Sequence, residues 1–272
     1  MATGVQLGFV GAGNMATALC RGIRSAGLLQ PEQMVASDPD EGRRKLFEAA
    51  TGVATTPDNA EVFRAEAVVL AVKPQVLPAV LEEVGPLLTR DTLVISIAAG
   101  IPTARIEAAT SEPVRVIRAM PNTPMLVGEG AAALCKGSHA TDDDMARAKR
   151  LFASCAAVFE VPEYLIHAVT ALSGSGPAYA FYLAELMARA GAEMGLAEED
   201  AVALANKTLL GAARMLAETA EPAAELRKKV TSPGGTTEAA LRSMRQDGVA
   251  EAIIKAIHTA CARSKELGSA PK

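Results

Sequence analysis

A glycine-rich turn near the start of the chain has residue types and spacing that suit phosphate groups. Residues 8–16 read Gly-Phe-Val-Gly-Ala-Gly-Asn-Met-Ala and follow an apolar run, which predicts a strand, a turn and the start of a helix. Gly11 permits the tight turn, Gly13 lets the backbone approach a pyrophosphate, and Ala16 keeps helix and strand close. The first N–H groups of the helix then bind phosphate oxygens. The pattern predicts dinucleotide binding; a glycine turn without a ligand is the alternative.

An acidic residue ends the second predicted strand, 25 residues beyond Gly13. Asp38 can accept hydrogen bonds from both hydroxyls of an adenosine ribose, and its charge repels a 2′-phosphate. This favours NADH over NADPH. Arg43 and Arg44 follow closely and could offset the repulsion, although solvated charges on a helix are the alternative interpretation of both.

A second glycine-rich loop, Ser232–Thr237, directly precedes a late predicted helix. Gly234 and Gly235 ahead of a helix start expose successive backbone N–H groups, which suits a carboxylate. The hydroxyls of Thr236 and Thr237 can hydrogen-bond a substrate or the backbone. An ordinary N-cap with turn glycines is the alternative.

The helix expected after the glycine-rich turn Ser173–Pro177 has no lysine at its start that could donate a proton as an acid. Hydroxyacid dehydrogenases with a similar two-domain plan carry a lysine on the helix after a glycine-rich turn, because a reduced carbonyl must be protonated. Here the turn Ser173–Pro177 is followed by Ala178–Ala184, and the next lysine is Lys207. This absence favours an electrophile that already carries its proton, such as an iminium.

Short β-branched runs alternate with helical patterns over about the first 160 residues. Runs such as residues 68–72 lack alternation, as in strands covered on both faces. The order predicts an α/β Rossmann fold with a doubly wound, mostly parallel sheet. Strands are expected at Val5–Val10, Gln33–Ser37, Ala67–Val72, Leu93–Ile97, Val114–Arg118 and near Val158. Helices are expected at Met15–Ala26, Glu41–Ala50, Val76–Leu88, Thr103–Ala109 and Asp142–Ala156.

Strand signals stop after about residue 162. Helices are expected at Glu163–Leu172, Pro177–Met194, Glu198–Glu218, Ala223–Val230, Thr237–Arg245 and Val249–Leu267, with Gly268 as the stop of the last. We therefore predict a dinucleotide-binding Rossmann domain at 1–162. It is followed at 163–272 by an all-α substrate-binding and dimerisation domain.

The helix expected at Pro177–Met194 is apolar on nearly all sides. From Ala178 onward its only charges are Glu185, Arg189 and Glu193, which form a single line. Such a helix must be covered on nearly all sides, which a segment of about 110 residues does not easily do alone. We infer that a second subunit completes the core; burial inside a monomeric bundle is the alternative.

Composition excludes several classes of partner. Lys and Arg number 27 against 31 Asp and Glu, a net charge of −4, and aromatics are 3%, which argues against nucleic acid and anionic membranes. One stretch without charged residues, residues 165–184, is interrupted by the turn Ser173–Pro177, so no membrane span is expected. The four cysteines and three histidines have no metal-ligand spacing, and buried thiols in a reducing cytoplasm are expected. The start of the chain has no targeting pattern, so a cytoplasmic location is expected.

Six segments, in order along nearly the whole chain, make the sequence resemble pyrroline-5-carboxylate reductases. They are Val10–Met15, Ala71–Pro74, Ala98–Gly100, Met120–Pro124, Leu172–Tyr179 and Ser232–Thr237. The resemblance implies reduction of 1-pyrroline-5-carboxylate to L-proline by NAD(P)H, the last step of proline biosynthesis. It also implies a helical dimerisation domain with active sites at the subunit interface, and often a ring of dimers forming a decamer. No metal is implied.

The resemblance also implies roles for individual residues. The N–H groups of Gly235 and Thr236 would bind the substrate carboxylate, and the hydroxyl of Thr237 would hydrogen-bond the ring nitrogen as the catalytic contact. Substrate-binding residues would be Glu163, Ser232, Gly234, Gly235, Thr236 and Thr237. Cofactor-binding residues would be Val10, Gly11, Ala12, Gly13, Asn14, Met15, Asp38, Asn59, Ala71, Val72, Lys73, Pro74, Ala98 and Gly100. Two positions depart from some relatives: Asp38 replaces Ser, and Lys229 replaces Asn.

Two other functions remain open at this stage. One is an imine or ketone reductase of the same architecture that acts on another small anion. The other is a non-catalytic nucleotide sensor whose helical domain contacts proteins, and the Ser232–Thr237 loop argues against it.

Overall fold

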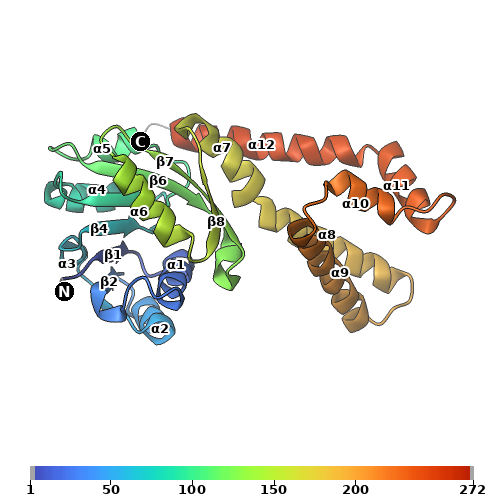
Figure 1. The fold of residues 1–272 in the computed structure, drawn as a ribbon, viewed down its shortest axis with the longest axis horizontal. Helices are drawn as coiled ribbons and strands as arrows, with labels where there is room; N and C mark the ends of the chain where they lie inside the picture. The colour runs from blue at the N-terminus through green and yellow to red at the C-terminus, as the bar shows by residue number, and fades with distance from the viewer. Residues whose placement is uncertain (1–3, 270–272) are drawn as a thin grey trace. The chain divides into compact units, whose positions relative to one another are not determined.

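The computed structural model describes residues 4–269, and the chain forms two compact units (Figure 1). The first unit runs up to Gly174 and takes in the chain again from Ala260. The second unit is Ser175–Thr259. The predicted cofactor-binding residues, which lie between Val10 and Gly100, belong to the first unit, and the Ser232–Thr237 loop belongs to the second.

The first unit is built on one eight-stranded sheet with the order β3-β2-β1-β4-β5-β6-β7-β8. All neighbouring strands are parallel except β6 and β7, so β7 and β8 run against the other six. The predicted doubly wound, mostly parallel sheet is confirmed. The strands are β1 (Leu7–Val10), β2 (Met34–Ser37), β3 (Ala54–Thr56), β4 (Ala67–Leu70), β5 (Leu93–Ser96), β6 (Arg115–Pro121), β7 (Gly130–Lys136) and β8 (Ala156–Glu160).

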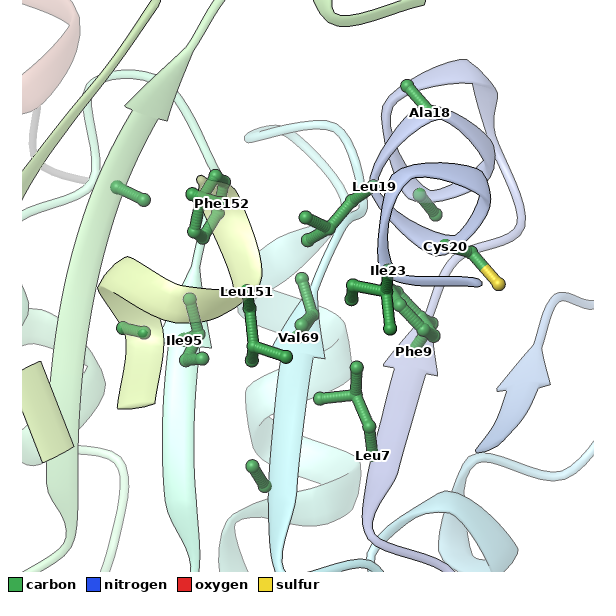
Figure 2. Packing of buried hydrophobic residues seen from close by; sticks show 14 of the residues in the cluster. Leu7, Phe9, Ala18, Leu19, Cys20, Ile23, Val69, Ile95, Leu151 and Phe152 are labelled. Atoms are coloured by element: carbon green, nitrogen blue, oxygen red, sulfur yellow. The ribbon is translucent and has the colours of Figure 1, made fainter. Parts of the chain in front are cut away.

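Helices cover both faces of the sheet, which explains the unbroken apolar runs in its central strands. Every residue of β1, β4 and β5 is buried. On one face, Leu19 and Ile23 of one helix and Leu151 and Phe152 of another lie over these strands (Figure 2). Burying a side chain of this size contributes about 1.5–3 kcal/mol to the stability of the folded state. The helices of this unit are α1 (Asn14–Ser25), α2 (Glu41–Thr51), α3 (Asn59–Val62), α4 (Leu77–Val84), α5 (Thr103–Glu107), α6 (Asp142–Phe152) and α7 (Ile166–Val169).

Several predicted elements differ from the observed ones. β3, β7 and the short helix α3 were not expected. β7 reads Gly-Ala-Ala-Ala-Leu-Cys-Lys, and a run without β-branched or aromatic residues carries little strand propensity. The expected helix Glu163–Leu172 is three short pieces: 3₁₀ turn η4 (Glu163–Leu165), α7, and π-helical turn η5 (Thr170–Gly174).

The second unit contains α8 (Gly176–Glu193), α9 (Glu198–Glu218), α10 (Ala223–Lys229), α11 (Thr236–Gln246) and the larger part of α12 (Val249–Ser269). α8 packs against α9, where a Cβ added at Gly191 would lie 3.1 Å from the Cβ of Ala201. Of the residues in α8, only Gly191 is buried, and Phe181 and Tyr182 are more than half exposed. Residues 4–269 therefore leave the apolar surface of α8 uncovered, as the sequence predicts. None of the helices within residues 4–269 is both long and apolar enough to cross a membrane.

The prediction that Gly268 stops the last helix is wrong, because α12 continues to Ser269. Gly268 instead lies against the turn that follows β5. A Cβ at Gly268 would come within 2.7 Å of the carbonyl oxygen of Gly100, which itself has φ +79°. Here the missing side chain permits close packing of helix and turn rather than a change of backbone direction.

Candidate active site

The first glycine-rich turn follows β1, which pairs with β2 on one side and with β4 on the other. The order of the strands along the chain reverses at this point of the sheet. Ligands of doubly wound sheets bind at this point, outside the carboxyl ends of the strands. Gly11 has φ +99°, and a Cβ there would come within 2.8 Å of the Ala71 carbonyl oxygen. Only glycine fits this position.

The start of α1 offers free hydrogen-bond donors. Gly13 is the N-cap of α1, no side chain caps the helix, and no atom lies within 4 Å of a Cβ built at Gly13. Within residues 4–269, the N–H groups of Gly13, Asn14 and Met15 have no hydrogen-bond partner. An open approach and unpaired N–H groups at the positive end of a helix fit a pyrophosphate. Ala16 is completely buried in the core, as its predicted packing role requires.

Asp38 is buried and contacts the glycine-rich turn directly. Its carboxylate accepts hydrogen bonds from the N–H of Ala12 at 3.1 Å and of Asp40 at 3.0 Å. The Arg43 guanidinium lies 3.9 Å from the same carboxylate, while Arg44 donates to the Asp38 carbonyl oxygen at 2.7 Å. A negative charge therefore stands at the carboxyl end of β2, with two arginines close by.

The other predicted cofactor residues follow the same edge of the sheet. Ala71–Pro74 come directly after β4, and Ala98–Gly100 come just after β5. Asn59 begins α3, where its side-chain oxygen accepts from the Ser37 hydroxyl at 2.7 Å. Lys73 is exposed, and its ammonium forms no ion pair with any residue in the described range 4–269. The carboxyl ends of β1, β2, β4 and β5 thus bring these loops together, because parallel strands end at one edge.

The Ser232–Thr237 loop starts α11, with Gly235 as its N-cap and Gly234 at φ +73°. The N–H of Gly234 donates to the Glu238 carboxylate at 2.8 Å, and that of Gly235 donates to the Ser232 carbonyl at 3.0 Å. The N–H groups of Thr236 and Thr237 have no hydrogen-bond partner in the part of the chain that the structure describes. The N–H groups of Thr236 and Thr237 are therefore open to a ligand, whereas the predicted Gly235 donor is engaged in the turn.

Glu163, predicted to lie near the substrate, is bound on both carboxylate oxygens within the first unit. Oε1 accepts from the Thr103 N–H at 2.8 Å and from the Arg118 guanidinium at 2.9 Å, and Oε2 accepts from the Thr103 hydroxyl at 2.8 Å. Burial alone would raise the pKa of Glu163, but these hydrogen bonds outweigh it and hold the pKa below its ordinary value. The carboxyl is therefore ionised at neutral pH.

Sequence reasoning missed Arg118 and Thr103 as members of this cluster. A signal was present: Arg118 is a charged residue within the otherwise apolar run Val116–Met120 of a predicted core strand. A charge at such a position requires a buried partner. The sequence does not say which carboxylate supplies it, because Glu163 is 45 positions away.

The four cysteines differ in their exposure. Cys20, Cys135 and Cys155 are buried thiols, as predicted, whereas Cys261 is partly exposed. Burial raises the pKa of Cys20 to about 11 and, together with the Glu163 charge, that of Cys135 to about 12. Among the described residues, no three side chains of His, Cys, Asp or Glu gather as metal ligands.

Comparison with known proteins shows which families and solved structures this chain is similar to. Residues 163–267 match the family model described as pyrroline-5-carboxylate reductase dimerisation, and residues 6–100 match one described as NADP oxidoreductase, coenzyme F420-dependent. The pyrroline-5-carboxylate reductase of Methanosarcina acetivorans is 42% identical, over 97% of this chain and 98% of that protein. The solved Coxiella burnetii enzyme of the same name has a TM-score of 0.89 and 38% identity, covering 98% and 99% of the two chains. The Plasmodium falciparum pyrroline carboxylate reductase, solved with NADP bound, has a TM-score of 0.87 and 31% identity over 97% and 98%.

Proposed function

This chain belongs to the pyrroline-5-carboxylate reductase family, and we propose that its two glycine-rich loops hold the two ligands of that reaction. The enzyme reduces 1-pyrroline-5-carboxylate to L-proline with a nicotinamide dinucleotide, the last step of proline biosynthesis. The observation that carries this function is the 42% identity over 97% of the chain. The unpaired N–H groups at the starts of α1 and α11 support the proposal that the first loop binds the dinucleotide and the second binds the substrate.

The first loop fits the dinucleotide. When bound, a reduced nicotinamide supplies the hydride that goes to the C=N carbon. The N–H groups of Gly13, Asn14 and Met15 would hold the pyrophosphate, and Asp38 and Asn59 would lie near the adenosine ribose. The remaining contacts would come from Val10, Gly11, Ala12, Ala71, Val72, Lys73, Pro74, Ala98 and Gly100.

The second loop fits the substrate. We propose that the Thr236 and Thr237 N–H groups bind its carboxylate, with Ser232, Gly234 and Gly235 shaping the loop. The Thr237 hydroxyl would hydrogen-bond the ring nitrogen and orient the C=N carbon. Glu163 would contribute a fixed negative charge near the substrate. Because a protonated imine already carries its proton, no side-chain acid is required, which agrees with the stretch free of lysine after Pro177.

The helical part of the chain serves self-association. A family model described as dimerisation covers residues 163–267, and the exposed apolar residues of α8 require a cover. We propose the domain division at residues 162 and 163, where that match begins. We also propose a dimer as the smallest active unit, a ring of dimers up to a decamer, and a location in the cytoplasm.

Activity assays test the function directly. Purified protein should oxidise NADH or NADPH in the presence of 1-pyrroline-5-carboxylate, and turnover with pyruvate or with other ring imines should be much slower. Binding of NADH without turnover would instead indicate a nucleotide sensor. Faster turnover of another small cyclic anion would indicate a different imine reductase.

Replacing Asp38 by Ser should move the cofactor preference toward NADPH. The change removes the negative charge that repels a 2′-phosphate, and it weakens the hydrogen bond to the Ala12 N–H. We expect the NADPH:NADH ratio of kcat/KM to rise about tenfold, or roughly 1.4 kcal/mol. Asp40→Ser is the matched control, because it removes an exposed charge two positions away and leaves Ser as a good N-cap of α2. An unchanged ratio for Asp38→Ser would rule out this role.

A further inference from the structure

Arg118 is a buried cation on a central strand of the first unit. It is 2% exposed, and its neighbours across the sheet are Ser96 on β5 and Cys135 on β7. Its Nη1 donates to Glu163 Oε1 at 2.9 Å, while its Nη2 is buried without a hydrogen-bond partner in residues 4–269. A buried pair with an orphaned donor is a poor source of stability. The arrangement therefore calls for another explanation.

The pairing fixes both the position and the orientation of the Glu163 carboxylate. Three donors hold it: the Arg118 guanidinium, the Thr103 N–H and the Thr103 hydroxyl. They come from β6 and from the first residue of α5, two elements of the rigid sheet unit. A carboxylate offers about four acceptor sites, so one remains for a further donor.

Within residues 4–269, the ion pair of Glu163 is with Arg118. The titratable groups that face it are Arg118, Cys135 and His167. Burial keeps Cys135 a thiol. Burial, followed by the charges of Arg118 and Lys265, lowers the pKa of His167, whose Nδ1 lies 3.0 Å from the Ser264 hydroxyl oxygen. Both groups are neutral at pH 7, so neither of them balances the Glu163 charge, and the ion pair with Arg118 does.

We propose that Arg118 is a positioning residue for the reductase reaction, which holds Glu163 where its carboxylate acts on the substrate. The inference rests on the proposed contact between Glu163 and the substrate. A carboxylate held at one place favours the protonated, positively charged imine near it. Without Arg118 the carboxylate would keep only the two Thr103 donors and would lose the positive charge that balances it. Substrate binding should therefore weaken, whereas dinucleotide binding should not change.

Steady-state kinetics of the full chain test the proposal. Arg118→Met should raise the KM for 1-pyrroline-5-carboxylate by about 10- to 100-fold and leave the KM for NADH or NADPH unchanged. Glu163→Gln should have a similar effect, and the double variant should be no worse than the poorer single variant, because both changes remove one interaction. Arg118→Lys should recover part of the loss, since an ammonium can still donate to Glu163.

Arg115→Met is the matched control. Arg115 lies on the same strand and donates to the Asp144 carboxylate at 2.7 Å, but it has no contact with Glu163. This variant should lower the melting temperature and leave the KM for 1-pyrroline-5-carboxylate unchanged. If Arg118→Met behaves in the same way, its role is structural and the proposal is wrong.

Two further outcomes keep the test decisive. If Arg118→Met does not fold, Thr103→Val replaces it, because this change removes only the hydroxyl donor to Oε2. Thr103→Val is then combined with Arg118→Lys, so that Glu163 keeps only the Thr103 N–H and an ammonium as donors. A normal substrate KM in this double variant would overturn the proposal. A normal substrate KM for Glu163→Gln would overturn it as well, by removing the contact on which it rests. Turnover by the unmodified enzyme separates each of these results from a failure of the reductase activity itself.

Discussion

Replacing Gly13 by Val should abolish dinucleotide binding and leave the fold intact. The structure leaves open space where a Cβ at Gly13 would lie, so the folded chain accepts the side chain. The isopropyl group would, however, occupy the place where a pyrophosphate approaches the N–H groups of α1. We expect the affinity for NADH and NADPH to fall at least about 100-fold, roughly 2.7 kcal/mol. Fluorescence titration of the reduced cofactors measures this directly.

Gly11→Val is the comparison variant for Gly13→Val, because it should disturb the fold as well as dinucleotide binding. Gly11 has φ +99°, and its Cβ would collide with the Ala71 carbonyl oxygen at 2.8 Å. This variant should lose binding because the turn and its strands are disrupted, with a lower melting temperature. Gly13→Val should keep the melting temperature of the unmodified protein. Retained NADH affinity in a folded Gly13→Val variant would contradict the proposed site.

Replacing Thr237 by Val should lower kcat/KM for 1-pyrroline-5-carboxylate by about 100-fold, the scale for losing one aimed hydrogen bond, here the one that the hydroxyl oxygen would accept from the N–H of the protonated imine. Valine has nearly the same shape and keeps the backbone N–H at the start of α11. The loss therefore isolates the hydroxyl, which is proposed to orient the ring nitrogen. Cofactor affinity should not change, because the Thr237 hydroxyl is proposed to contact the substrate and not the dinucleotide.

Thr236→Val is the matched control for Thr237→Val. Thr236 is the neighbouring residue, with an exposed side chain and an unpaired N–H of its own. Only the backbone N–H of Thr236 is proposed to bind the carboxylate, and valine keeps this N–H, so kcat/KM should stay within about threefold of the unmodified enzyme. Activity within threefold for Thr237→Val as well would mean that its hydroxyl does not contribute to catalysis.

The parts of the fold that could be predicted are those whose sequence pattern extends over only a few neighbouring residues. The apolar runs of β1, β4 and β5 indicate strands buried on both faces, and all three are. β7 was missed because its alanine-rich sequence has little propensity of its own, and pairing with β6 and β8 decides its state. Gly268 was misread because helix ends and close helix packing both select glycine.

The sequence by itself determined the Rossmann sheet, the glycine turn at Gly11 and Gly13, the helix start after Gly235 and the uncovered apolar helix α8. Each depends on backbone preference or periodicity, which act locally. Only the tertiary structure decided that the Asp38 carboxylate accepts a hydrogen bond from the Ala12 N–H of the turn. It also decided that Glu163 binds Arg118 and Thr103. It also decided that the Gly235 N–H is already used. Partners of polar groups depend on which distant segments packing brings within 3 Å, and no local pattern in the chain encodes that.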